Sequence, residues 1–132
     1  QKSSPCAQLK SVLKVQPLGG VGACLRIAEE IGLPVVVSSA LESSVGIAAG
    51  VALAAALPKL EYACGLATVN LLTDDVALHP LLPVDGHLPV GAPTLDAPSV
   101  ARLQANPERR DHWERRLAEV TELRRMRQDP TP

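Results

Sequence analysis

Short apolar runs alternate with stretches of helical periodicity between residues 11 and 91, and a glycine or proline stands between most of them. Apolar residues at three- and four-residue spacing predict helices, whereas short β-branched runs predict strands. The predicted elements are, in order, a strand at 11–15, a helix at 21–31, a strand at 35–37, a helix from 43 or 44 to 57, and a strand at 61–64. Such strand–helix–strand units pair their strands in parallel with a right-handed crossover. The pattern therefore predicts an α/β fold, either part of an eightfold barrel or a small doubly wound sheet.

Glycine, proline and serine mark the predicted ends of the helices. Gly32 is placed to end the first helix, and Pro34 prevents the chain from resuming it. Ser43 or Ser44 can cap the second helix at its amino end. Residues 45–57 carry no charge, but a membrane span needs about 20 apolar residues. We therefore expect a helix that lies against a sheet, and no membrane segment.

Charge and cysteine content exclude several classes of partner. Thirteen basic and fourteen acidic side chains give a net charge of −1, which provides no general attraction to nucleic acid or to anionic membranes. Cys6, Cys24 and Cys64 have no CxxC spacing, so free thiols in a reducing cytoplasm are expected and not a disulfide framework or zinc site. Residues 1–10 are polar and predicted to be irregular, with no apolar signal-peptide core. The expected location is cytoplasmic.

Polar residues and one glycine stand at the predicted carboxyl ends of the strands, where ligands gather in parallel α/β folds. They are Lys14 and Gln16 after the first strand, Ser38, Ser39 and Glu42 after the second, and Gly65 and Thr68 after the third. Lys14 lies in an apolar run, where burial disfavours its charged form and suits it to act as an acid, base or cation. The alternative is an edge-strand lysine that extends to solvent. Ser38 and Ser39 could present hydroxyls to a carboxylate or simply cap a helix. From the residues alone the structural alternatives are favoured.

The remaining ionisable residues predict no metal site. His79 and His87 stand in a proline-rich loop, without Cys, Asp or Glu at ligand spacing. Asp74 and Asp75 fit a turn or a helix cap better than a metal ligand. The sequence contains no GxGxxG, P-loop or GxSxG motif.

The last zone, 92–132, is rich in proline and arginine, and 108–127 is predicted to be a helix. Trp113, Leu117 and Val120 form a narrow apolar stripe on it. Its seven arginines are interleaved with acidic residues, which is typical of a solvated helix docked by one narrow face and not of nucleic-acid binding.

Four segments resemble o-succinylbenzoate synthases, a family of the enolase superfamily. They are VLKVQPLGGV at 12–21, LPVVVSSALESSVG at 33–46, YACGLAT at 62–68 and PLLPVDG at 80–86. They follow the family's order, and each keeps its expected distance from the next over residues 11–91. The resemblance implies that this region is the carboxyl-terminal part of a (β/α)7β TIM-like barrel, comprising its sixth to eighth strands, followed by a separate C-terminal helix.

The resemblance also implies an activity and a site. Members dehydrate the cyclohexadiene carboxylate SHCHC to o-succinylbenzoate in menaquinone biosynthesis, with Mg2+ at the carboxyl rim of the barrel. A lysine on an early strand removes the proton α to the carboxylate, and the metal with a lysine on the sixth strand stabilises the enediolate. Lys14 matches that second lysine. Ser38 and Ser39 match the loop near the substrate's succinyl carboxylate, and Gly65 closes the eighth strand.

Several family features have no counterpart in these residues. The Lys-x-Lys pair, the three acidic metal ligands and the capping domain are missing, and Gly22 stands where an arginine is common. We therefore expect no Mg2+ ligands in this chain and a truncated form that is inactive alone. Two alternatives stay open: a non-catalytic module that self-associates through exposed sheet edges, and the related N-acylamino acid racemase activity.

Overall fold

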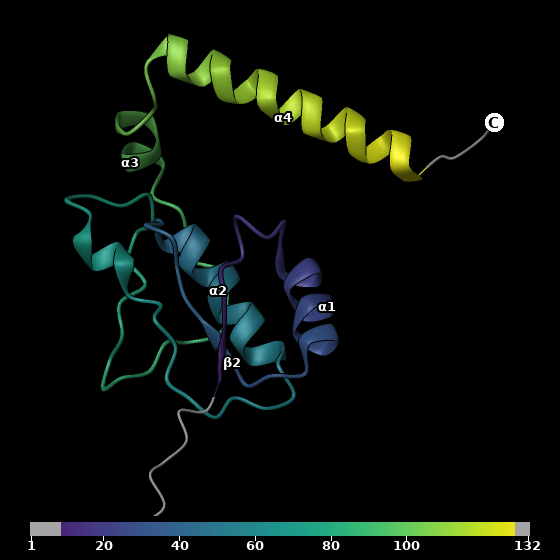
Figure 1. The fold of residues 1–132 in the computed structure, drawn as a ribbon. Helices are drawn as coiled ribbons and strands as arrows, with labels where there is room; N and C mark the ends of the chain where they lie inside the picture. Colours follow the sequence, from purple (N-terminus) through teal and green to yellow (C-terminus); the bar gives the residue numbers. More distant parts are fainter. Residues whose placement is uncertain (1–8, 129–132) are drawn as a thin grey trace, which may run out of the picture. The chain divides into compact units, whose positions relative to one another are not determined.

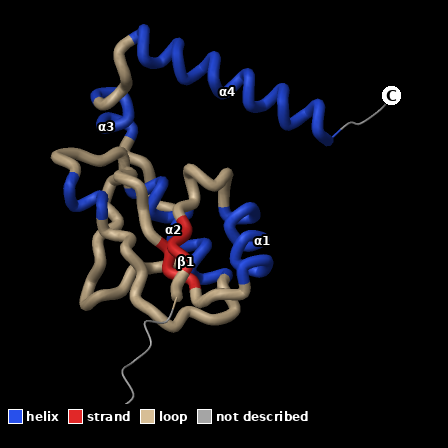
Figure 2. Tube along the Cα trace, viewed as in Figure 1, coloured by secondary structure: helices blue, strands red, loops and turns tan. Residues whose placement is uncertain are grey.

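A two-stranded parallel sheet lies at the centre of the first part of the computed structural model, which describes residues 9–128 (Figures 1 and 2). The elements of this part are, in order, β1 (Ser11–Leu13), α1 (Val21–Ile31), β2 (Val35–Val37), α2 (Ser44–Ala56), the 3-10 helix η1 (Thr68–Leu71) and α3 (Ala97–Arg102). Val12 of β1 lies opposite Val36 of β2, so the predicted parallel strand–helix–strand unit is confirmed. Cys6 and most of the predicted irregular segment lie outside the described residues.

The helices α1 and α2 pack against each other and cover one face of the sheet. Alternate strand residues face them: Leu13 and Val37 are buried, whereas Val12 is 59% exposed. The buried apolar cluster consists of Leu13, Val15, Cys24, Val35, Val37, Ile47, Val51, Leu53, Leu66 and Val69. It contains no aromatic ring, in agreement with a sequence that has only 2% aromatic residues.

The predicted end of α1 is confirmed in detail. Gly32 has a φ of 62°, in the left-handed region, and its N–H donates to the carbonyl oxygen of Ala28 at 3.2 Å. A side chain at this backbone conformation would be strained, which is why glycine commonly ends helices in this way. The chain then turns directly into β2.

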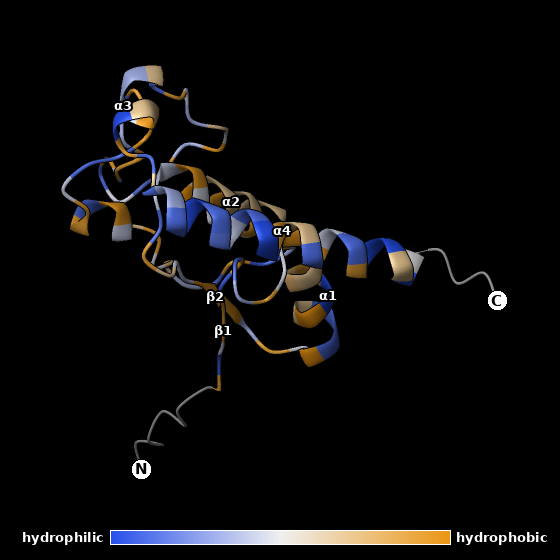
Figure 3. Ribbon diagram, turned by 90° about the horizontal axis from the view of Figure 1, so that it is seen from above, coloured by the Kyte–Doolittle hydropathy of each residue, from blue (hydrophilic) through white to orange (hydrophobic). Residues whose placement is uncertain are grey.

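The second helix, α2, is apolar on nearly all sides (Figure 3). A helix with this pattern is buried in a protein core, and Ile47 and Leu53 of α2 are fully buried. Gly50 brings the helix close to Leu66, since an added Cβ would lie 2.6 Å from Leu66 Cδ2.

The predicted third strand at 61–64 is wrong. These residues form no strand, and only Gly65 joins the sheet, through a parallel bridge to Ser38. The Gly65 N–H donates to the carbonyl oxygen of Val37, and the Ser39 N–H donates to that of Gly65, both at 2.9 Å. In the parallel register of this bridge 62–64 would lie opposite β2, but the run bonds to the sheet only at Gly65 and so lacks the hydrogen-bonded ladder of a strand.

A second unit begins at Ala101 and is described by itself. Its main element is α4 (Pro107–Gln128), which corresponds to the predicted tail helix. Hydrophilic side chains dominate it, with isolated hydrophobic ones between them (Figure 3). Trp113 and Leu117 are 54% and 67% exposed, so no described element of this unit covers the apolar stripe.

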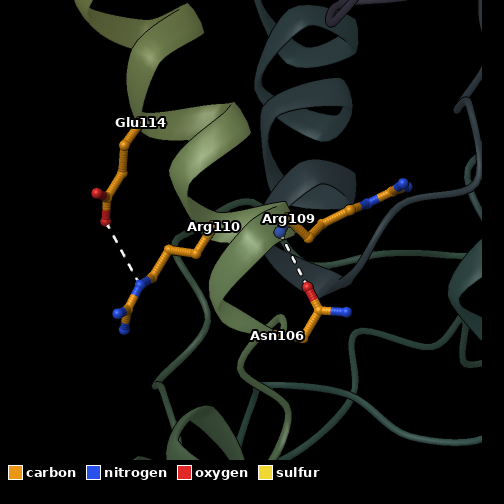
Figure 4. Close-up of polar contacts among 4 residues, drawn as sticks. All are labelled: Asn106, Arg109, Arg110 and Glu114. Atoms are coloured by element: carbon orange, nitrogen blue, oxygen red, sulfur yellow. Dashed lines mark hydrogen bonds and ion pairs between the residues drawn. The ribbon is translucent and has the colours of Figure 1, made fainter.

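Short polar contacts stabilise the amino end of α4 (Figure 4). Asn106 Oδ1 accepts a hydrogen bond from the N–H of Arg109 at 2.9 Å, as a capping residue does. Arg110 and Glu114 form an ion pair at 3.8 Å, one helical turn apart. Among residues 9–128, no helix combines the length and the apolarity needed to cross a membrane.

Candidate active site

Lys14 stands at the carboxyl end of β1 and is turned towards the end of β2. The register that places Leu13 opposite Val37 puts Lys14 beside Ser38. Its Nζ donates a hydrogen bond to the carbonyl oxygen of Ser39 and lies 3.4 Å from Ser38 Oγ. The side chain is half-buried. The ammonium is therefore held at the rim by protein acceptors.

The two serines after β2 have different surroundings. Ser39 is 4% exposed; its hydroxyl donates to the carbonyl oxygen of Gly65 and accepts from Thr68 Oγ1, both at 2.9 Å. Ser38 is half-buried, and its hydroxyl makes two long contacts of 3.4 Å within residues 9–128, to Lys14 Nζ and to the Ser39 carbonyl oxygen. Neither serine stands at the start of α2, so the helix-cap interpretation is wrong for both. The Ser38 hydroxyl can turn to a ligand, whereas the Ser39 hydroxyl is engaged inside the protein.

Gly65 leaves room for the Ser38 hydroxyl. A Cβ at Gly65 would lie 3.4 Å from Ser38 Oγ, which is closer than most such contacts. Lys14, Ser38, Ser39 and Gly65, predicted from separate segments, thus lie together at one end of the sheet.

Glu42, the third polar residue after β2, is buried. It is 4% exposed, and its Oε1 has no hydrogen-bond partner among the described residues. Its N–H lies 3.5 Å from Thr68 Oγ1. An added Cβ at Gly46 would lie 2.7 Å from Glu42 Cβ and 3.2 Å from Gln16 Nε2. The glycine one turn after Glu42 was the available sequence signal for this close packing.

A second buried polar cluster lies at the amino end of α2. Asp75 is 8% exposed and accepts hydrogen bonds from the N–H of Ser44, at 3.1 Å, and from its hydroxyl. The Ser44 oxygen in turn accepts from the N–H of Leu81 at 2.7 Å. Ser43 occupies the cap position but makes no capping bond with its side chain. Asp75 begins no helix of its own, so the pair is not a local helix cap; it binds the first turn of α2 from 31 residues away, and this cluster is structural.

Two groups away from the rim have shifted pKa values. Burial raises the pKa of the Cys24 thiol, whose side chain is inaccessible to solvent. A hydrogen bond to Glu61, together with the charge of that carboxylate, raises the pKa of Lys59.

The described residues do not fit a magnesium site. His79 and His87 are exposed, and His87 Nδ1 lies 2.7 Å from the carbonyl oxygen of Asp85. Nowhere in residues 9–128 do three or more His, Cys, Asp or Glu side chains converge, whereas Mg2+ requires oxygen ligands in near-octahedral geometry. No step of the chemistry below is therefore assigned to a metal held by these residues.

Comparisons with known proteins relate residues 11–97 to the family described as enolase C-terminal domain-like. The chain is 63% identical to the o-succinylbenzoate synthase of Thermobifida fusca over 107 residues, which cover 81% of this chain and 33% of that protein. It is 57% identical to the o-succinylbenzoate synthase of Mycobacterium leprae over 103 residues, or 78% of this chain and 30% of that protein. The corresponding protein of Mycobacterium tuberculosis is 56% identical over 103 residues, with coverages of 78% and 31%. The chain spans about a third of the length of these curated relatives.

Proposed function

This chain belongs to the enolase C-terminal domain-like family, and we propose that it supplies the Lys14 side of an o-succinylbenzoate synthase active site. The observation that carries the proposal is the Lys14 ammonium at the strand ends, bonded to the Ser39 carbonyl oxygen beside Ser38 Oγ. Relatives that bear this enzyme name are 56–63% identical to the chain. Under this proposal, the fold of residues 11–91 is part of a TIM-like barrel.

The proposed reaction removes the proton α to the carboxylate of SHCHC and expels the hydroxyl group as water. Negative charge develops on the carboxylate as the proton leaves. A fixed ammonium stabilises that charge more in the transition state than in the ground state, which is the requirement for catalysis. Lys14 fills this role, and the Ser38 hydroxyl donates to the second carboxylate of the substrate, in the space that Gly65 leaves open. The base and Mg2+ come from other parts of the enzyme.

A chimera tests the proposal. The segment of the Thermobifida fusca enzyme that matches residues 11–97 is replaced by this chain's residues, and SHCHC dehydration is measured with Mg2+. We expect turnover from the chimera and none from these 132 residues alone. Lys14→Ala in the chimera lowers kcat/KM by about 100-fold or more, while Lys59→Ala, a matched change at an exposed lysine, leaves it unchanged. An inactive chimera, or equal effects of the two substitutions, would refute the assignment. Turnover of N-acylamino acids in place of SHCHC would assign the racemase activity instead.

We further propose that the isolated chain self-associates. β1 has a strand neighbour on one side only among the described residues, and Val12 is 59% exposed. A groove of about 570 Å³ also lies beside the 60–67 segment; its apolar lining includes Val51, Leu60, Leu66, Leu88 and Val90. Unpaired strand edges readily take up another chain. Light scattering after size exclusion should give a dimer or larger species, and Val12→Lys should reduce it while Val120→Lys should not. A monomer would contradict this proposal.

A further inference from the structure

Thr68 has no role in the proposed reaction, although its hydroxyl contacts two other rim residues. Thr68 Oγ1 donates to Ser39 Oγ at 2.9 Å, and the N–H of Glu42 lies 3.5 Å from the same oxygen. Thr68 therefore ties together both ends of the short loop that follows β2.

Ser39, the loop residue that Thr68 binds through its side chain, also binds the Lys14 ammonium. Lys14 Nζ donates to the carbonyl oxygen of Ser39. The other groups of Ser39 are all engaged: its N–H and its hydroxyl both donate to the carbonyl oxygen of Gly65 at 2.9 Å, and the hydroxyl accepts from Thr68. These bonds hold the Ser39 Cα at the end of β2, and the contact between Thr68 and the N–H of Glu42 limits how far the rest of the loop, with the Ser39 carbonyl, can turn.

Thr68 is itself held firmly. It begins η1, in which the N–H of Asn70 donates to the carbonyl oxygen of Ala67 at 3.1 Å. The next residue, Val69, is 4% exposed and belongs to the buried apolar cluster. The hydroxyl is thus presented from a rigid turn anchored in the core, as the support of a functional group requires.

We propose that Thr68 is a positioning residue for Lys14, acting through the Ser39 carbonyl. Removal of the hydroxyl leaves Ser39 Oγ without its donor and frees the loop to rotate, so the acceptor moves away from the ammonium. The catalytic meaning of this arrangement rests on the proposed function, because only there does the direction of the ammonium affect turnover. The positioning itself is independent of any reaction.

The test compares acetylation of two lysines in the full 132-residue chain. An amine-reactive acetyl ester is added in limiting amount, and mass spectrometry gives the rate at Lys14 relative to Lys59, which is exposed. A Lys14 that loses its acceptor acetylates faster. We expect Thr68→Val, which keeps the shape but lacks the hydroxyl, to raise the Lys14/Lys59 ratio by about fivefold, the equivalent of one hydrogen bond of about 1 kcal/mol.

Thr68→Ser is the matched control, because it retains the hydroxyl and should keep the wild-type ratio. If the methyl group of Thr68 and not its hydroxyl were responsible, Thr68→Ser would raise the Lys14/Lys59 ratio as Thr68→Val does. Circular dichroism establishes that each variant is folded, and if Thr68→Val is not, Thr68→Ala provides the same comparison. An unchanged ratio in the folded hydroxyl-free variant, or an equal rise with Thr68→Ser, would overturn the proposal. Since no turnover is measured, failure here and failure of the dehydration assay are distinguishable.

Discussion

Two adjacent serines at the start of α2 should respond very differently to replacement by alanine. Ser43 stands at the cap position, where its side chain makes no capping bond. Ser44 is fully buried, donates to the Asp75 carboxylate and accepts from the N–H of Leu81. The two serines are adjacent in the sequence, but only the Ser44 side chain makes these two hydrogen bonds. Ser43→Ala is therefore the control for Ser44→Ala.

The magnitude follows from the two bonds that Ser44→Ala removes. A buried bond to a charged acceptor contributes about 1.5–3 kcal/mol, and a neutral one about 0.5–1.5 kcal/mol. The substitution leaves a carboxylate oxygen of Asp75, which is 8% exposed, and the N–H of the half-buried Leu81 without this partner. The Ser44 N–H still donates to Asp75 at 3.1 Å, so the cluster is weakened and not abolished. We expect a loss of about 3 kcal/mol for Ser44→Ala and under about 0.5 kcal/mol for Ser43→Ala.

Urea denaturation followed by circular dichroism measures both losses. With a slope of about 1.5 kcal/mol per molar urea, the Ser44→Ala midpoint falls by about 2 M, while that of Ser43→Ala stays close to the wild type. A double-mutant cycle with Asp75→Ala then isolates the side-chain pair, because the loss in the double variant should fall short of the sum of the two single losses, while the bond from the Ser44 N–H still makes Asp75→Ala costly in the Ser44→Ala background. Equal midpoints for the two serine variants, or a larger loss from Ser43→Ala, would refute this account of the cluster.

Two further predictions concern close packing and thiol burial. Gly46→Ala should destabilise the fold by about 1–2 kcal/mol, because overlap of the new Cβ with Glu42 Cβ, 2.7 Å away, outweighs a helix-propensity gain of about 1 kcal/mol. Gly22→Ala meets only a flexible side-chain end at 3.8 Å and should be neutral or stabilising in the same urea denaturation. A stabilising Gly46→Ala would contradict the packing. A thiol reagent at mildly alkaline pH should label Cys64 well before Cys24, since burial raises the pKa of the Cys24 thiol and closes it to solvent. Peptide mass spectrometry reads both sites, and equal rates would show that Cys24 is accessible.

Local sequence patterns predicted the elements whose form depends on neighbouring residues. Helical spacing located α1, and Gly32 ends it as expected because a left-handed residue is a local requirement. Lys14 and Ser38 could be placed at one rim because the carboxyl ends of parallel strands share an edge. None of these inferences needed a contact between distant segments.

Predictions that depended on distant partners were less successful. The run at 61–64 has the composition of a strand, but a strand also needs hydrogen bonds to a neighbour along its length, and this run bonds to β2 only at Gly65. Either Ser43 or Ser44 could have capped α2 from sequence alone, because the group that decides between them, Asp75, lies 31 residues beyond Ser44. The close approach of Glu42 to Gly46 is different, because the two are one helical turn apart and the glycine was visible in the sequence.

The bonds of Ser44 also set an order of events during synthesis. Its hydroxyl oxygen accepts a hydrogen bond from the N–H of Leu81, which follows it by 37 residues. At translation rates of about 5–20 residues per second, roughly 2–7 s separate the appearance of the two. Throughout that interval the amino end of α2 exists without the groups that will bury it, and its apolar surface is open to other nascent chains. The time needed to translate the residues between Ser44 and Leu81 therefore sets how long the amino end of α2 waits for this partner.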